Sequence, residues 1–457
     1  MSSVGPARQS DIRLPDDARR SLFVYNLFFP IVFAALLPSY LLRMFRRGGY
    51  GGKFAQRLGW FSHGDRAKLA CGGWTWLHSI SVGETMLALK LAREIRRLDP
   101  SRRIVISVTT STGYAVAEQA ACEWLDVIYN PLDLPAIVRR TLEVLRPRQI
   151  IFIEAIWPNL LATAKRQGIA VSFIPRLSPR SERRFRKATP LTGPIFRLLD
   201  LLAVAEPADV SRWTSLGVDP SRIRITGNSK FDPSHAGPSR ASEFRLLLET
   251  CGIGPGVPIL LGGSTFPGEE RILADVMCEL RVEFPDLLLI LVPRHVERST
   301  QIVSELAALS LNIVRRTQIR ESPPLSMNSG AATRPSVLLV DTTGELRDWY
   351  NLATVVFVGK SLTAHGGQNP VEPVMAGKPI VFGPNMENFH PIVSQWLAAD
   401  AAVQIGTTEE LAPALRALFR DPLRATQLAT RAREIASGHV GATERTATSL
   451  LSSLPLL

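Results

Sequence analysis

Two series of short apolar runs, each run followed by a segment of helical periodicity, limit most strongly what this chain can fold into. The first series begins at Trp74 and ends near Gly227, and the second extends from Pro258 to Ile405. Apolar runs of strand length that alternate with helices are typical of parallel sheets with crossover connections. We therefore predict an α/β protein with two doubly wound, Rossmann-like domains that face one another across a cleft.

The predicted strands divide evenly between the two domains. In the first domain they are 74–78, 103–108, 127–129, 149–153, 170–174, 201–204 and 223–227. In the second they are 258–261, 287–292, 311–314, 337–340, 354–358, 379–382 and 402–405. Between the series lies a stretch rich in Pro, Gly and Ser, which predicts a linker. The predicted organisation is a polar leader at 1–20, a membrane anchor at 21–45, domains at 46–232 and 240–457, and a linker at 233–239.

The N-terminal hydrophobic segment carries no charged residue from Ser21 to Leu42. A helix of that length crosses a hydrocarbon core of roughly 30 Å. Pro30 and Pro38 argue against a straight helix, so a kinked span and a shallow interfacial insertion both stay open. The basic residues that follow favour anionic headgroups of the cytoplasmic leaflet, namely Arg43, Arg46, Arg47, Lys53 and Arg57. We expect an inner-membrane protein with its domains on the cytoplasmic face.

The formal net charge of +12 predicts an anionic partner. No helix-turn-helix pattern, zinc-knuckle spacing or RNA-binding aromatic signature accompanies the charge, so lipid is favoured over nucleic acid. A merely solvated basic surface is the alternative. The four cysteines have no C-x-x-C spacing, which favours a reducing compartment, and the seven histidines show no metal-binding motif.

Glu84 is the candidate general base. The predicted strand 74–80 leads into Ser81, Gly83 and Glu84, and residues 85–97 have helical periodicity. This order places the carboxylate at a strand-to-helix turn, where a group with an adjusted pKa can deprotonate a hydroxyl. Alternatively, Glu84 stabilises the N-terminus of the helix through its charge.

Other polar groups in the first domain follow predicted strands or crowd one helix. Glu154 comes directly after the strand 149–153, and a hydroxyl-rich loop at 109–113 follows an earlier strand. That loop suits sugar or phosphate contacts, or an ordinary helix cap. A basic run could bind acceptor phosphates or simply be solvated, and it comprises Arg180, Arg183, Arg184, Arg186 and Lys187.

The second domain carries a glycine turn, a carboxamide and a carboxylate in the stretch His365–Pro373. Glycines allow a backbone to approach a phosphate, and Glu372 can accept hydrogen bonds from ribose hydroxyls, which suits a nucleotide-sugar pocket. A polar cap on a strand-turn-helix connection is the alternative. Further polar groups at predicted strand ends are Gly263, Ser264, Thr265, Arg294, His295, Gly344 and Glu345.

Together, the segments that contain these residues, in their order along the chain, resemble the 3-deoxy-D-manno-octulosonic acid (Kdo) transferases of lipopolysaccharide biosynthesis. The matching segments are 57–59, 78–84, 157–160, 176–178, 180–181, 226–232, 263–265, 267–270, 293–295, 341–346, 357–359, 361–362, 366–373 and 383–384. The resemblance implies a GT-B fold and N-terminal membrane attachment. It also implies an inverting enzyme that uses CMP-Kdo as donor and a lipid A precursor as acceptor, with no required metal or other cofactor.

The resemblance further implies roles for individual residues. Glu84 would be the catalytic base. The acceptor would be bound by Ser81, Gly83, Glu154, Arg176 and Arg180. The donor would be bound by Gly263, Ser264, Thr265, Arg294, His295, Gly344, Glu345, Gly367, Gln368, Asn369 and Glu372. The other partners implied are inner-membrane lipids.

Four positions depart from the family pattern. The family's Glu-x-Glu is reduced to one shifted carboxylate, Glu154, followed by Ala155. Pro175 stands in place of Ala, Lys360 in place of Gly, and Gln368 in place of His, which removes an ionisable imidazole. These departures keep two alternatives open: a GT-B glycosyltransferase with another donor or glycolipid acceptor, and a non-catalytic membrane protein that binds a nucleotide or sugar.

Overall fold

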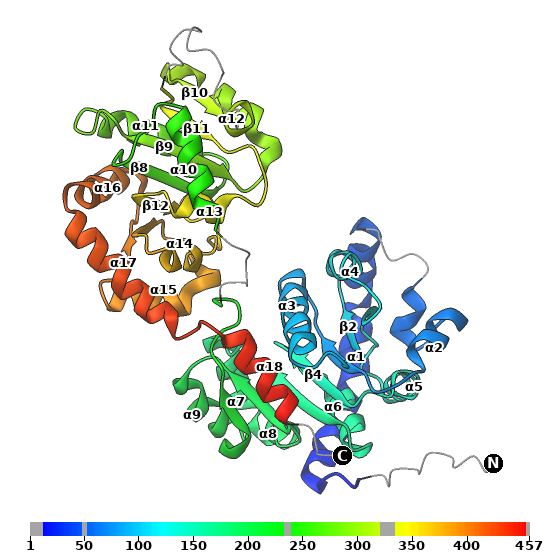
Figure 1. The fold of residues 1–457 in the computed structure, drawn as a ribbon. Coiled ribbons are helices and arrows are strands. Elements are labelled where there is room, and N and C mark those ends of the chain that lie inside the picture. Colours follow the sequence, from blue (N-terminus) through cyan, green and yellow to red (C-terminus); the bar gives the residue numbers. More distant parts are fainter. Residues whose placement is uncertain (1–11, 48–52, 233–238, 320–333, 454–457) are drawn as a thin grey trace. The chain divides into compact units, whose positions relative to one another are not determined.

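The computed structural model describes residues 12–47, 53–232, 239–319 and 334–453. The chain divides into two compact units, the first formed by Met1–Asp232 with Gly441–Leu457 and the second by Pro233–Val440. Each unit contains one seven-stranded sheet, and helices pack around it (Figure 1). The predicted linker lies almost wholly outside the described residues.

The sheet of the first unit is parallel and has the strand order β3-β2-β1-β4-β5-β6-β7. Its strands are β1 (Thr75–His78), β2 (Ile104–Val108), β3 (Leu125–Tyr129), β4 (Gln149–Ile153), β5 (Ala170–Ile174), β6 (Leu201–Val204) and β7 (Ile223–Ile225). The order reverses between β1 and β4, whose register pairs Thr75 with Gln149. Such a reversal opens a crevice at the carboxyl ends of the strands.

Helices pack around the sheet of the first unit. They are α1 (Asp16–Arg47), α2 (His63–Leu69), α3 (Val82–Leu98), α4 (Ser111–Glu118), α5 (Pro135–Leu145), α6 (Pro158–Arg166), α7 (Pro179–Lys187), α8 (Thr189–Phe196), α9 (Pro207–Ser215) and α18 (Ala442–Ser452). Helix α5 illustrates their amphipathic pattern, because Val138, Leu142 and Leu145 are buried at helical spacing.

The sheet of the second unit is also parallel and has the order β10-β11-β9-β8-β12-β13-β14, with a reversal between β8 and β12. Its strands are β8 (Ile259–Thr265), β9 (Leu288–Pro293), β10 (Ile313–Arg315), β11 (Val337–Leu339), β12 (Val355–Val358), β13 (Ile380–Phe382) and β14 (Val403–Gln404). Its helices are α10 (Ala241–Thr250), α11 (Glu269–Leu280), α12 (Ser299–Leu306), α13 (Leu346–Tyr350), α14 (Val371–Met375), α15 (His390–Ala398), α16 (Leu411–Arg420) and α17 (Pro422–Ser437).

The prediction of two doubly wound α/β domains is confirmed, and every predicted strand is present. Most strands in both sheets are buried on both faces, which explains why they appear in the sequence as continuous apolar runs. The main difference is at β8, which continues past the predicted Leu261 to Thr265. A register shift between Gly263 and Thr265 lets the strand bend there.

The last helix, α18, belongs to the first unit, whereas the sequence predicted one C-terminal domain from 240 to 457. Asp232 caps this helix, since its two carboxylate oxygens accept hydrogen bonds from the N–H groups of Gly441 and Thr443, each at 2.9 Å. Ala447 and Leu450 are fully buried in the core of the first unit. An amphipathic pattern shows that a helix has a partner, but not which of two sheets provides it.

Helix α1 occupies the segment predicted as a membrane anchor and continues through Pro30 and Pro38. Its N-terminal part packs in the first unit, where Ala18 and Leu22 are buried. Several apolar residues that follow are exposed, with exposed fractions of 53–71% in the group Phe23, Leu27, Phe28, Ile31 and Val32. Among the described residues, no helix is both long and apolar enough to cross a bilayer, so the expected span over 21–42 is not supported.

Candidate functional site

The crevice of the first sheet brings together polar residues from neighbouring strands. Ser81 and Glu84 follow β1, Glu154 follows the adjacent β4, and Arg176 follows β5, the next strand in the sheet. The carboxyl ends of parallel strands lie at one edge, so the topology places these residues at a common edge, as predicted for Glu84 and Glu154. Arg180 lies further along the chain, exposed in the first turn of α7.

Glu84 is a buried carboxyl group at the start of α3. Its Oε2 accepts a hydrogen bond from the N–H of Ile80 at 2.7 Å, and its Oε1 accepts one from the hydroxyl of Ser81 at 3.0 Å. The Ser81 oxygen in turn accepts a bond from the N–H of Glu84 at 3.4 Å and caps the helix. These contacts place the Glu84 carboxylate at the N-terminus of α3, which is compatible with both of its predicted roles.

The same surroundings alter the pKa of Glu84. Burial is the largest influence and raises the pKa above the usual value, and the charge of Glu154 adds to the rise. The hydrogen bonds from Ile80 and Ser81 and the charge of Lys230 oppose it. A carboxyl group whose pKa is shifted toward neutrality suits a general base, because a stronger base accepts a proton more readily.

Lys230 is a site residue that the sequence did not single out. Its Nζ lies 2.5 Å from Oε1 of Glu154, and it approaches from the segment after β7. Glu154 has a φ of 61°, a left-handed conformation that costs a non-glycine residue energy and is common at functional sites. Lys230 occurs within a segment that matches the family, and its position after a strand was the available signal.

Gly83 leaves the turn beside Glu84 open. It is exposed, and no atom of the chain lies within 4 Å of the place that a Cβ would occupy. The packing of the described residues therefore gives no reason for a glycine here.

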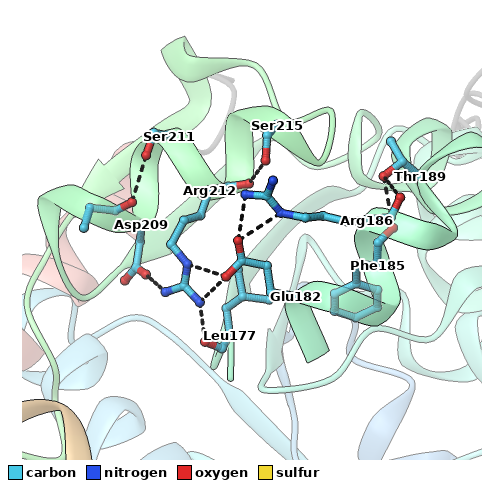
Figure 2. Close-up of polar contacts among 10 residues, drawn as sticks. Leu177, Glu182, Phe185, Arg186, Thr189, Asp209, Ser211, Arg212 and Ser215 are labelled. Atoms are coloured by element: carbon cyan, nitrogen blue, oxygen red, sulfur yellow. Dashed lines mark hydrogen bonds and ion pairs between the residues drawn. The ribbon is translucent and has the colours of Figure 1, made fainter. Parts of the chain in front are cut away.

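The basic helix α7 divides into paired and unpaired cations. Figure 2 shows that Glu182 binds both Arg186 and Arg212, and that Arg212 also binds Asp209 and the carbonyl oxygen of Leu177. Arg186 is thus engaged within the chain. The cations of α7 that have no acidic partner among the described residues are Arg180, Arg183, Arg184 and Lys187.

In the second unit, the buried carboxylate of Glu269 organises the edge of the sheet. It accepts hydrogen bonds from the N–H groups of Lys360, Ser361 and Leu362 at 2.8–3.1 Å, and from that of Phe266 at 2.8 Å. It thereby joins the loop after β8 to the loop after β12. Glu269 is another organising residue that the sequence prediction left out, although it lies in a segment that matches the family.

Close backbone contacts complete this edge. A Cβ on Gly359 would lie 2.3 Å from the carbonyl oxygen of Ser264, and one on Gly263 would lie 2.9 Å from the hydroxyl of Tyr350. Ser264 and Lys360 have positive φ values of 53° and 58°. The left-handed backbone at Lys360 is a conformation that glycine adopts more readily than lysine.

The glycine turn of the predicted nucleotide pocket is attached to the same edge. The N–H groups of Gly367 and Gln368 donate to the carbonyl oxygens of Lys360 and Gly359, each at 3.1 Å. Asn369 donates to Oε1 of Glu372 at 3.0 Å and fixes the direction of that carboxylate. This contact brings together the two residues predicted to hold the nucleotide.

The remaining predicted donor residues differ in availability. Arg294 and His295 follow β9 and are exposed, and Nδ1 of His295 lies 3.4 Å from Glu297. Thr265 is buried, and its hydroxyl donates to Glu270 at 3.0 Å. Glu345 forms an ion pair with Arg316 at 3.2 Å, and both side chains are largely buried.

Thr265 and Glu345 therefore already have structural partners within the chain. Gly344 is exposed in the turn that precedes Glu345 and has a φ of 84°. Within the described part of the chain, no group of three His, Cys, Asp or Glu residues is placed to hold a metal ion.

Two doubly wound units, with polar groups gathered at the carboxyl edge of each parallel sheet, are typical of nucleotide-sugar-dependent glycosyltransferases. Residues 52–233 match the family model described as 3-deoxy-D-manno-octulosonic-acid transferase (kdotransferase). The chain is 30% identical over 434 residues to 3-deoxy-D-manno-octulosonic acid transferase of Bordetella pertussis, a match that covers 92% of this chain and 97% of the relative. The chain belongs to the Kdo transferase family, and it is a glycosyltransferase enzyme.

Other relatives and structures are also similar. The 3-deoxy-D-manno-octulosonic acid transferase of Haemophilus influenzae is 28% identical over 401 residues, which is 87% of this chain and 90% of the relative. Among solved structures, the C-terminal CMP-Kdo binding domain of WaaA from Acinetobacter baumannii is 26% identical, with a TM-score of 0.37, and covers 43% of this chain and 95% of that domain. HepE of Anabaena, in complex with UDP and glucose, has a TM-score of 0.47 at 15% identity, and the match covers 83% of this chain and 100% of HepE.

Proposed function

We propose that this enzyme transfers Kdo from CMP-Kdo to a lipid A precursor, with inversion at the anomeric carbon. One observation carries the assignment of the chemistry: a buried carboxyl group of raised pKa, Glu84, lies where the first sheet reverses its strand order. The names of the relatives support Kdo as the transferred sugar.

In the proposed reaction, Glu84 removes the proton from the acceptor hydroxyl as its oxygen attacks the anomeric carbon. The bond to the CMP phosphate breaks, and CMP leaves with the electron pair. A single displacement of this kind inverts the anomeric centre. The exposed guanidinium of Arg294 and the backbone around Ser264 stabilise the departing phosphate, while Asn369 and Glu372 hold the nucleotide.

We also propose that the protein is attached to the cytoplasmic face of the inner membrane. The exposed apolar side chains of α1 support interfacial attachment, since Phe23, Phe28 and Ile31 present aromatic and aliphatic surface. The net charge of +12 adds attraction to anionic lipid.

The second candidate is a glycosyltransferase of the same fold with another donor or glycolipid acceptor. Ala155 favours it, because this alanine stands beside Glu154 where the family has a second carboxylate. A binding protein without turnover would lack a functional base, and a buried carboxyl group at the Glu84 position argues against it.

The test is transfer from CMP-Kdo, generated in situ, to a tetraacylated, bisphosphorylated disaccharide lipid, with products read by mass spectrometry. We expect product from the wild type and a loss of about 100-fold or more in kcat for Glu84→Gln. Glu94→Gln is the matched control, because Glu94 lies on α3 but pairs with Arg97. A wild type that binds CMP and makes no product would favour another acceptor, and one that does not bind CMP would refute the donor assignment.

A further inference from the structure

A cavity of about 600 Å³ lies within the first unit, lined mainly by α1 and α8, with contributions from α7, α9, β5 and the segment after β4. Most of its lining is hydrocarbon, contributed by side chains that include Val24, Phe28, Phe185, Ile195 and Phe196. The volume lies in the range of pockets that enclose small-molecule ligands. The mechanism proposed above does not use this cavity.

The α1 wall of the cavity is held by a network of polar contacts. The side chains of Asn26 and Asn159 exchange two hydrogen bonds, at 3.0 and 2.7 Å. Tyr25 hydrogen-bonds to Asp133, whose carboxylate also accepts bonds from the N–H groups of Asn159 and Leu160 at 3.0 and 2.9 Å. These contacts attach α1 to the start of α6, so the wall is part of the fold.

The cavity reaches both the protein surface and the candidate active site. Phe28 and Val32 line it and are nevertheless 57% and 53% exposed, so a chain can enter beside α1. Its described charged lining residues are Glu154 and Arg176, which follow β4 and β5 at the carboxyl edge of the sheet. Glu154 is the residue whose charge acts on Glu84.

The charges around the cavity indicate the chemistry of its occupant. Helix α7 contributes Phe185 to the lining, and its contacts through Glu182 to Arg212 hold the helix in place (Figure 2). The same helix carries four exposed cations without acidic partners in the described residues. A hydrocarbon cavity beside free cations matches an amphiphile with a long apolar chain and anionic phosphates.

We propose that this cavity holds one acyl chain of the phosphorylated glycolipid acceptor and thereby positions the acceptor hydroxyl at Glu84. The inference rests on the proposed function and deepens it, because it identifies the acyl chain as a recognised part of the substrate. A phospholipid also has chains and a phosphate, but the extension of the cavity to Glu154 favours the molecule that reacts there. The enzyme is expected to distinguish acceptors by their acyl chains.

The first test fills the cavity. Val24→Trp places a large ring in the cavity from α1, and Val282→Trp is the control for an added surface ring, since Val282 is 89% exposed and not part of the lining. We expect Val24→Trp to raise KM for the tetraacylated acceptor at least tenfold and to leave KM for the deacylated bisphosphorylated disaccharide unchanged. Val282→Trp should change neither value. Leu191→Trp, from the α8 side, replaces Val24→Trp if that variant does not fold.

The second test needs no turnover. An acceptor with a diazirine near the end of one acyl chain is photolysed with Glu84→Gln, and the attached peptides are mapped by mass spectrometry. We expect attachment at α7 and α8, and competition by unlabelled acceptor but not by phospholipid vesicles. Attachment outside the cavity, displacement by phospholipid alone, or an unchanged KM in the filled variants would overturn the proposal. If the wild type transfers Kdo to neither acceptor, the proposed function fails, while the mapping still decides what the cavity holds.

Discussion

The Nζ of Lys230 lies 2.5 Å from Oε1 of Glu154, and this ion pair stands beside the buried carboxyl group of Glu84. The two partners act on Glu84 in opposite directions, because Glu154 raises its pKa and Lys230 lowers it. Substitution of either partner should therefore shift the pKa of Glu84, the proposed base, without replacing Glu84 itself.

The pH dependence of transfer should follow this pair. A base must be deprotonated, so the rate falls as the pH drops through the raised pKa of Glu84. Glu154→Gln should move this acidic limb to lower pH, and Lys230→Met should move it to higher pH. The measurement is kcat/KM against pH. Lys165→Met, which breaks the 2.7 Å pair with Asp200 in the same unit, should leave the limb in place. Shifts of both variants in one direction would contradict the role of Glu84.

Gly83→Ala should separate folding from activity. A Cβ there meets no atom of the chain within 4 Å, so the free energy of unfolding should stay the same or rise by up to about 1 kcal/mol. We expect kcat/KM to fall at least fivefold, because an acceptor close to Glu84 would meet the new methyl group. Gly113→Ala is the contrasting variant: its Cβ would lie 2.8 Å from Val108, and it should lower stability by about 1–3 kcal/mol. Full activity in Gly83→Ala would place the acceptor elsewhere.

Lys360 should carry a conformational cost. Its φ of 58° is unfavourable for a side chain, so Lys360→Gly should be more stable than Lys360→Ala by about 1 kcal/mol. Both variants lack the amine and should bind CMP several-fold more weakly than the wild type. Urea unfolding and calorimetric titration with CMP measure the two effects. Equal stability of the two variants would show that this backbone costs nothing.

Glu269→Gln should loosen the edge of the second sheet. The buried carboxylate accepts bonds from the N–H groups of Lys360, Ser361 and Leu362, and an amide replaces one accepting oxygen with a donor. We expect a loss of about 2–4 kcal/mol in the free energy of unfolding, together with weaker CMP binding. Glu243→Gln, at an exposed ion pair with Arg240, should change neither. Unchanged CMP affinity in a destabilised Glu269→Gln would separate this loop from the donor site.

Asp133 should make stability depend on pH in the direction opposite to that of an ion-paired carboxylate. Burial raises its pKa from 3.8 to about 6, although hydrogen bonds from Asn159, Leu160 and Tyr25 oppose the rise. Its contribution is therefore fully present below pH 4 and is lost as the pH rises through 6, by up to about 3 kcal/mol. Relative to the wild type, Asp133→Asn should gain about 2–3 kcal/mol in unfolding free energy between pH 4 and 7. A constant difference in urea unfolding would contradict the raised pKa.

The sequence predicted the strands well because parallel strands buried on both faces form apolar runs of strand length, and segments of helical periodicity separate these runs. It also placed Glu84 and Glu154 at strand ends, which the order of a doubly wound sheet brings to one edge. Arg176 was named only through the family resemblance. The roles assigned to these residues remain predictions.

Lys230 and Glu269 were missed as site residues for a common reason. Each acts through a partner distant in sequence: Glu154 is 76 residues from Lys230, and Lys360 is 91 residues from Glu269. The cavity was missed because it arises from the packing of several helices against the carboxyl edge of the sheet, and each helix alone shows only an ordinary apolar face. The assignment of α18 failed for the same reason, since the choice of partner is a tertiary property.

The return of α18 to the first unit means that the second unit is an insertion within the first. A ribosome synthesises the sheet of the first unit, then the whole second unit, and only afterwards the helix that Asp232 caps. The first unit therefore cannot complete its core until α18 has been synthesised, whereas the second can fold while it emerges. Removal of α18 would accordingly damage the unit that contains Glu84, although this helix adjoins the other unit in the sequence.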